Sequence, residues 1–153
     1  MSSIFFDTSA LFSAVFSESG AARELMRLAV RGDVLLFISA DVITEARRNI
    51  TNKSPDYPPI LDFLLDLGVF SKAPEPSPQN VQAATQYTEQ KDAMIVAAAI
   101  LGDVTYLATF DRKHLIDPPE VGQKSGLIIT TPGSILRSIR PAFSEGRSST
   151  TEK

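Results

Sequence analysis

Four acidic residues stand at comparable positions beside predicted strands. Asp7 directly follows the first apolar run of the chain, and Asp111 follows the fourth. Glu45 lies on the helix expected after the second run, and Asp92 begins the apolar helix before the fourth. If the first and fourth strands are neighbours, the four side chains converge on the carboxyl edge of one sheet, where open α/β proteins bind ligands.

Such a cluster has the chemistry of a site for a hard divalent cation. Neighbouring carboxylates raise one another's pKa, so they are costly to bring together without a cation. Oxygen ligands without His or Cys suit Mg²⁺ or Mn²⁺ rather than zinc, and magnesium held in this way typically serves phosphate chemistry. The chain contains no cysteine, which excludes disulfides, thiolate zinc sites and cysteine nucleophiles.

Each acid also has a simpler interpretation when it is taken alone. Asp7 and Asp92 suit helix caps, and Asp111 suits a turn. Glu45 suits a solvated helix position where it pairs with Arg48. The shared position of all four at one end of the predicted sheet favours a site.

Strands and helices alternate along the chain, which predicts a three-layer α/β/α domain with a mostly parallel sheet of four or five strands. The apolar helix that begins at Asp92 is expected at the centre of the fold. Expected strands cover residues 4–6, 34–38, 69–70, 104–108 and 127–130. Expected helices cover residues 9–16, 21–31, 40–50, 60–67, 79–88, 92–101 and 132–140, and expected loops cover 51–59, 73–78 and 113–126.

The 153 residues have the length of a single domain, which we expect to span residues 1–140. The Ser/Thr-rich segment 141–153 is expected to be a disordered tail. A net charge of −3 argues against a general nucleic-acid coat protein but allows an enzyme that acts on nucleic acid. No secretory signal is recognisable and no apolar segment reaches about 18 residues, so we expect a soluble cytoplasmic protein without a membrane segment.

Four stretches around the acids resemble the signatures of the PIN-domain ribonucleases, in the order that the family has them. They are Ile4–Leu11, Ser39–Glu45, Asp92–Ala99 and Leu107–Asp111. Four such motifs at suitable spacings are specific where one is not, and the resemblance covers the chain to about residue 140. The group most similar in size and layout is the VapC-type toxin ribonucleases of toxin–antitoxin pairs.

The resemblance implies a five-stranded parallel sheet and hydrolysis of RNA phosphodiester bonds with the help of a metal ion. It assigns a Mg²⁺ or Mn²⁺ site to the four acids and places two hydroxyls, of Ser9 and Thr109, beside these ligands. It also implies a cognate antitoxin that covers the site with a basic side chain, and a homodimer as a common state.

Basic and aromatic residues add less to the prediction. Basic residues near three of the acids are placed to hold a phosphate backbone: Arg47, Arg48 and Lys53 after Glu45, and Lys91, Arg112 and Lys113 beside Asp92 and Asp111. His114 is the only histidine and reads best as a surface residue. The Phe and Tyr positions read as core, and the sequence shows no aromatic platform for stacking bases.

Two alternatives remain beside the ribonuclease. The first is a catalytically silent PIN-like module that binds RNA or a protein; the complete set of four acids argues against it. The second is a phosphotransferase or phosphatase with Asp7 as nucleophile. That chemistry ordinarily needs a second acid close behind the nucleophile, which Thr8, Ser9 and Ala10 do not supply.

Overall fold

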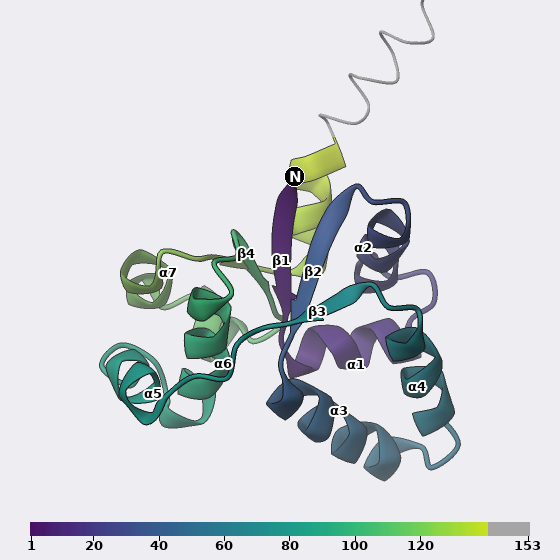
Figure 1. Ribbon diagram of the computed structural model, residues 1–153, viewed down its shortest axis with the longest axis horizontal. Helices are drawn as coiled ribbons and strands as arrows, with labels where there is room; N and C mark the ends of the chain where they lie inside the picture. The colour runs from purple at the N-terminus through teal and green to yellow at the C-terminus, as the bar shows by residue number, and fades with distance from the viewer. Residues whose placement is uncertain (141–153) are drawn as a thin grey trace, which may run out of the picture.

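A computed structural model describes residues 1–140 and shows a central sheet with helices on both sides (Figure 1). All five strands are parallel and their order is β3-β2-β1-β4-β5. The strands are β1 (Ser2–Phe6), β2 (Val34–Ile38), β3 (Phe70–Lys72), β4 (Tyr106–Ala108) and β5 (Ile128–Thr130). The predicted α/β/α fold is confirmed, and the first and fourth strands are neighbours.

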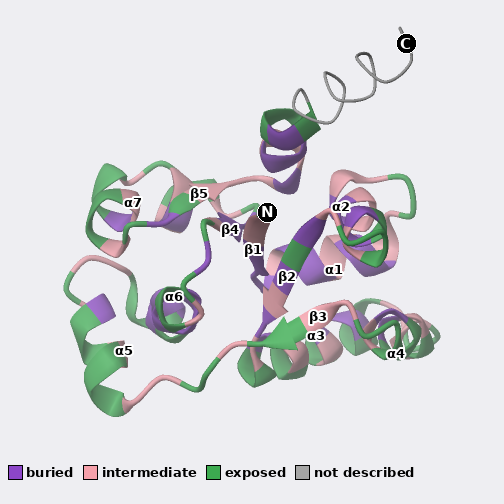
Figure 2. Ribbon diagram, turned by 45° about the horizontal axis from the view of Figure 1, so that its top comes forward, coloured by how far each residue is buried: buried purple, intermediate pink, exposed green. Residues whose placement is uncertain are grey.

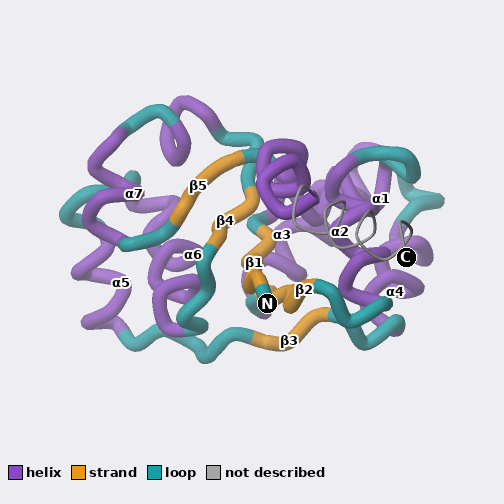
Figure 3. Tube along the Cα trace, turned by 90° about the horizontal axis from the view of Figure 1, so that it is seen from above, coloured by secondary structure: helices purple, strands orange, loops and turns teal. Residues whose placement is uncertain are grey.

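The helices form the two outer layers of the domain. Those that follow β1 and β2 lie on one side of the sheet, and those that follow β3 and β4 lie on the other (Figures 1 and 3). The first group is α1 (Thr8–Phe16), α2 (Ala21–Val30), α3 (Ala40–Lys53) and α4 (Pro58–Asp66). The second group is α5 (Pro78–Ala84), α6 (Gln90–Leu101) and α7 (Pro119–Ser125), and a closing helix covers residues 132–140.

The direction of the strand order reverses between β1 and β4. From β1 the chain adds β2 and then β3 on one side, and it then returns to place β4 and β5 on the other. Right-handed crossovers in opposite directions put the connecting helices on opposite faces, as Figure 1 shows. Such a switch point leaves a crevice at the carboxyl ends of the two strands, where open α/β sheets bind ligands.

The core is centred on β1, which is covered on both faces, whereas the edge strand β3 is largely exposed (Figure 2). Ile4, Phe5 and Phe6 of β1 are fully buried, which is why the central parallel strand is apolar without alternation. Phe6 packs edge-to-face on Phe70 of β3 with ring centroids 5.4 Å apart. Helix α6 is buried around most of its circumference, in agreement with its predicted central position.

The segment 113–126, predicted as a loop, is largely helical. It holds most of η1 (Arg112–Ile116), a wide turn of π-helix, followed by α7. Pro119 is the first residue of α7, where its missing N–H costs nothing, and Gly126 ends the helix with a left-handed φ of 77°. The loop prediction was wrong because these residues mark the two ends of a helix.

The other predicted loops are shorter than expected for the same reason. Pro78 is the first residue of α5, after a capping box that Ser77 forms with Asn80. Helix α3 continues to Lys53 and α4 begins at Pro58, so the predicted loop 51–59 shrinks from both ends. The predicted tail, 141–153, lies outside the described residues. Within residues 1–140, none of the helices combines the length and apolarity needed to cross a bilayer.

Adjacent leucines of β2 provide a test of this sheet. Leu36 is 1% exposed and Leu35 is 47% exposed, so they differ in environment but not in chemistry. We expect Leu36→Ala to lower the free energy of unfolding by about 2–5 kcal/mol because it opens a cavity in the core. Leu35→Ala should cost less than about 1 kcal/mol, as measured by urea denaturation. Equal losses of unfolding free energy in the two variants would mean that the register assigned to β2 is wrong.

Candidate active site

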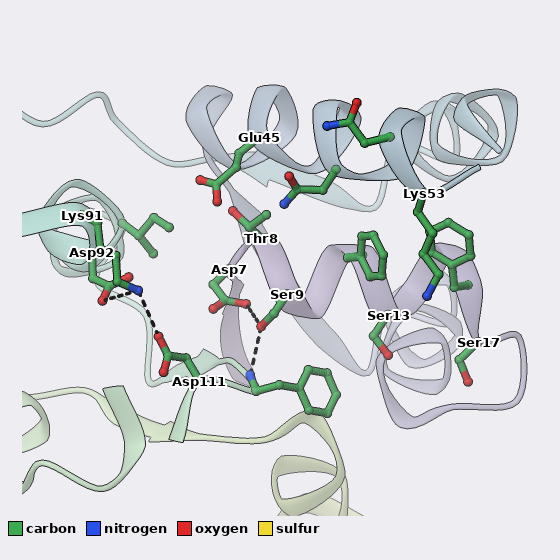
Figure 4. A pocket seen from close by; sticks show the side chains of 16 residues that line it. Asp7, Thr8, Ser9, Ser13, Ser17, Glu45, Lys53, Lys91, Asp92 and Asp111 are labelled. Atoms are coloured by element: carbon green, nitrogen blue, oxygen red, sulfur yellow. Dashed lines mark hydrogen bonds and ion pairs between the residues drawn. The ribbon is translucent and has the colours of Figure 1, made fainter. Parts of the chain in front are cut away.

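A cleft of about 1000 Å³ lies at the carboxyl ends of β1 and β4. All four acids predicted from the sequence line it: Asp7, Glu45, Asp92 and Asp111. Figure 4 shows them coming from four segments: the start of α1, the middle of α3, the first turn of α6 and the residues after β4. The switch point thus brings together residues that lie more than 100 positions apart in sequence.

Asp7 is both the cap of α1 and a wall of the cleft. Its Oδ1 accepts hydrogen bonds from the Ala10 amide (2.9 Å) and the Ser9 hydroxyl (2.7 Å), and its Oδ2 accepts one from the Thr109 hydroxyl. The side chain is almost completely buried, and burial raises the pKa of Asp7 although the three hydrogen bonds oppose this. The interpretations as a cap and as a site residue therefore do not compete.

The two hydroxyls predicted beside the acids connect α1 to the segment after β4. Ser9 Oγ accepts a hydrogen bond from the Phe110 amide (2.9 Å), and Thr109 Oγ accepts one from the Asp111 amide (3.0 Å). Each hydroxyl donates to Asp7 and accepts from a backbone amide in the segment after β4, so both are used twice. This arrangement fixes the positions of Asp7 and Asp111 relative to each other.

Asp92 and Asp111 share one cation, Lys91. The Lys91 ammonium lies 3.6 Å from a carboxylate oxygen of each (Figure 4). Burial raises the pKa of Asp92, and Lys91 only partly offsets this. Burial also acts to raise the pKa of Asp111, but the His114 amide and Lys91 outweigh it, and the pKa is lowered.

His114, for which the sequence favoured a surface position over a contact with phosphate, lies beside this site. Its Nδ1 lies 3.4 Å from Asp111 Oδ1, and its side chain is 28% exposed. One ligand atom each from Asp92, Asp111 and His114 lie within 4.8 Å of one another. The η1 turn, which begins immediately after Asp111, brings the histidine back over the aspartate. The signal was its spacing of three residues from Asp111, which has meaning only if that segment is helical.

Three other residues predicted for the site, Glu45, Arg48 and Arg112, form no ion pair with Asp92 or Asp111. Glu45 is exposed on α3 and faces Asp7 across the cleft (Figure 4). Arg48 is exposed and lines a separate cavity of about 370 Å³ together with Arg47. Arg112 is exposed and does not contribute to the cleft lining. The structure thus brings Ser9, Thr109 and Lys91 to the acids, but not Arg48 or Arg112.

The donor set fits a hard divalent cation. Among the described residues, Asp92 Oδ2 is buried and has no hydrogen-bond partner, which is costly for a carboxylate oxygen. The four carboxylates line the same cleft, and Lys91 is the positive charge that contacts Asp92 and Asp111. A cation bound by carboxylate oxygens and water would coordinate this Asp92 oxygen, whose nearest positive charge is the Lys91 ammonium at 3.6 Å, and would offset the negative charge.

Comparisons with known proteins identify the family and the fold. The sequence profile of the PIN domain matches residues 3–113. No curated protein sequence matches the chain. Among solved structures, PAE2754 from Pyrobaculum aerophilum has a TM-score of 0.62 at 19% identity, covering 89% of this chain and 94% of that one.

Two further solved structures have a similar fold, and one of them is of a toxin. VapBC2 from Rickettsia felis, bound to a DNA fragment from its promoter, has a TM-score of 0.59 at 18% identity, covering 83% of this chain and 96% of that one. VapC20 from Mycobacterium tuberculosis, a toxin that cleaves the sarcin–ricin loop, has a TM-score of 0.53 at 14% identity, covering 72% and 91%. At these identities the likeness establishes the fold.

Replacing Asp7 by Asn should leave the metal-free protein as stable as the wild type, or more stable, at pH 7. Asn caps helices as well as Asp does and carries no charge that burial penalises. Its Oδ1 keeps the bonds from Ala10 and Ser9, and its Nδ2 can donate to the Thr109 hydroxyl in place of the bond that Asp7 Oδ2 accepts. Because the pKa of Asp7 is raised in the folded state, its ionisation costs stability above that pKa, and this cost disappears as the pH falls toward 3.8. The melting temperature of Asp7→Asn in EDTA should therefore exceed that of the wild type most at neutral pH.

Asp7→Ala is the matched control for this prediction. It removes the cap and strands the donors of Ser9 and Thr109, so it should cost about 1 kcal/mol or more and lower the melting temperature. A clear loss of stability in Asp7→Asn at neutral pH would mean that the negative charge itself supports the metal-free fold.

Proposed function

The chain belongs to the PIN-domain family, and we propose that it is a metal-dependent endoribonuclease, the toxin of a toxin–antitoxin pair. The observation that carries the proposal is the convergence of Asp7, Glu45, Asp92 and Asp111 on one cleft at the switch point of the sheet. In this proposal the four carboxylates hold Mg²⁺ or Mn²⁺ and the cleft takes a segment of RNA. Family membership supports a nuclease in general; the choice of RNA and of these metals is part of the proposal.

The bound metal would polarise the scissile phosphate, lower the pKa of an attacking water and stabilise charge on the leaving oxygen. The protein's own residues have separate tasks. The hydrogen bonds from Ser9 and Thr109 hold the Asp7 carboxylate in one orientation, as the residues behind a metal ligand commonly do. Lys91, with a side chain that is 60% exposed, can turn from Asp92 and Asp111 to a phosphate of the substrate.

The assignment as a toxin is supported by the similar fold of the proteins from toxin–antitoxin systems. An antitoxin that binds over the carboxylates would place a basic side chain among them, where Lys91 already marks a favourable position for a cation. The same proposal includes a cytoplasmic location and allows a homodimer. A silent module that binds RNA or a protein is the alternative, and a cleavage assay separates the two.

Cleavage of a mixed pool of structured and single-stranded RNA should require Mg²⁺ or Mn²⁺ and stop in EDTA. We expect Asp92→Asn to lower the rate by about 100-fold or more, since even residues behind a metal ligand commonly contribute 10–100-fold. Asp103→Asn is the matched control because Asp103 is exposed, lies outside the cleft and has a φ of 54° that Asn tolerates. Activity that survives both EDTA and Asp92→Asn would exclude this mechanism.

Metal binding can be measured without any RNA. Mn²⁺ should raise the melting temperature of the wild type in proportion to the logarithm of its concentration above the Kd, because it binds only the folded protein. Asp92→Asn should reduce this shift strongly and Asp103→Asn should retain it. Metal binding by the wild type without cleavage of the pool would indicate a narrower RNA target. Neither binding nor cleavage would leave the four acids as caps and surface charges.

A further inference from the structure

Two carboxylates of the site have an imidazole beside them that the proposed function does not use. Asp92, Asp111 and His114 each offer one ligand atom, and these three atoms lie within 4.8 Å of one another. On one octahedral ion with bonds of about 2.1 Å, neighbouring ligands are about 3 Å apart and opposite ligands about 4.2 Å apart. The three atoms therefore lie close to the spacing at which a single ion contacts all of them.

The Asp92 carboxylate has an oxygen that is free to coordinate a cation. Asp92 is 7% exposed, and within residues 1–140 its Oδ2 has no hydrogen-bond partner. The Lys91 ammonium lies 3.6 Å from this oxygen, beyond the roughly 2.7–3.2 Å of a hydrogen bond. The Lys91 side chain is itself exposed and can turn away, so it does not block an ion.

The backbone holds His114 beside Asp111. Asp111 Oδ1 accepts a hydrogen bond from the His114 amide (3.0 Å), and the buried side chain of Leu115 anchors the η1 turn in the core. A bond of π-helical spacing, from the Ile116 amide to the Asp111 carbonyl (3.1 Å), widens this turn. Turns of this kind are rare and occur frequently at functional sites. As a result, His114 Nδ1 lies 3.4 Å from Asp111 Oδ1, close to the separation of neighbouring ligands.

The imidazole is accessible to an ion. The His114 side chain is partly exposed and lines a cavity of about 370 Å³ together with Glu89 and Gln90. Within residues 1–140 it is not part of the lining of the large cleft, whereas Asp92 and Asp111 are. An ion bound by all three residues would therefore stand at the edge of the cleft.

A nitrogen ligand changes which cation a site prefers. Mg²⁺ is a hard cation that takes oxygen ligands and loses its water reluctantly. Imidazole suits first-row transition metals, and the affinity of a given N/O site rises from Mn²⁺ through Fe²⁺ to Co²⁺. The expectation of Mg²⁺ or Mn²⁺ assumed a ligand set of oxygens alone. The structure places one nitrogen beside that set.

We propose that His114 is a ligand of the cation bound between Asp92 and Asp111, and that its imidazole makes this site prefer Mn²⁺ to Mg²⁺. The inference rests on the metal site of the proposed ribonuclease and adds the class of ion, a first-row transition-metal cation. Asp92 and Asp111 supply oxygens and His114 supplies a nitrogen. Lys91 leaves the two carboxylates when the ion enters.

Pulsed electron paramagnetic resonance of Mn²⁺ bound to the full chain tests for the nitrogen ligand. The chain contains a single histidine, so an untagged protein grown with ¹⁵N-histidine is labelled at His114 alone. The Mn²⁺ signal of the unlabelled protein should carry modulation from ¹⁴N, which labelling should convert to the ¹⁵N pattern. His114→Asn should remove the modulation.

Calorimetric titrations with Mn²⁺ and with Mg²⁺ measure the selectivity. His114→Asn should weaken Mn²⁺ binding about tenfold or more, since even residues behind a metal ligand commonly contribute 10–100-fold. Mg²⁺ binding should change less than about threefold, because Mg²⁺ prefers oxygen ligands. Lys113→Gln is the control: Lys113 is exposed and adjacent in sequence, so its loss should change both affinities alike and keep their ratio. Thermal melts check that both variants are folded.

The outcomes separate this inference from the function on which it rests. Mn²⁺ bound without nitrogen modulation, or a ratio of affinities that His114→Asn leaves unchanged, would overturn the inference and leave His114 as an ion-pair partner of Asp111. No binding of Mn²⁺ by the wild type would overturn it as well. Metal-dependent cleavage of RNA together with any of these results would leave the ribonuclease intact. Nitrogen modulation and the expected loss of selectivity would support His114 as a ligand, whatever the cleavage assay shows for the ribonuclease.

Discussion

The buried carboxylate of Asp7 is the constraint around which this domain is arranged. A carboxylate removed from water is tolerated only when its oxygens accept hydrogen bonds, and Asp7 accepts them from Ala10, Ser9 and Thr109. Two of these donors can be present only if α1 starts directly after β1, and the third only if β4 is the neighbour of β1. The strand order, the first helix turn and the geometry of the cleft are thus tied to one side chain.

The two ends of the cleft have complementary chemistry. Carboxylates dominate the end of the cleft at β1 and β4, while the lining from α1 and α3 toward the other end includes Phe12, Phe16, Asn49, Asn52 and Lys53. A net charge of −3 conceals this division, since the sum over the chain says nothing about which charges share a cleft. A net negative charge therefore does not by itself argue against a polyanionic substrate, provided that a cation offsets the carboxylates of the cleft.

Local sequence predicted the features that depend on local rules. The central strand β1 is a continuous buried apolar run and was found on that ground, and the acids at the strand ends followed from the topology that such runs imply. The edge strand β3 was predicted only at its start, because Ser71 and Lys72 are exposed and polar. Positions of prolines were less informative, because a proline at the first helical residue, such as Pro78 or Pro119, looks like a loop proline until the helix is known.

The features that were missed depend on which face of a helix is covered. Phe12 and Phe16 have the spacing of core residues, and sequence alone does not show that α3 leaves one side of them open to the cleft. His114 reaches Asp111 only through the wide η1 turn.

The site also depends on contacts between distant parts of the chain: the hydrogen bonds from Phe110 to Ser9 and from Thr109 to Asp7 span 101 and 102 positions. Contacts of such separation form late, so a nascent chain carries Asp7 and Glu45 long before it has an assembled centre.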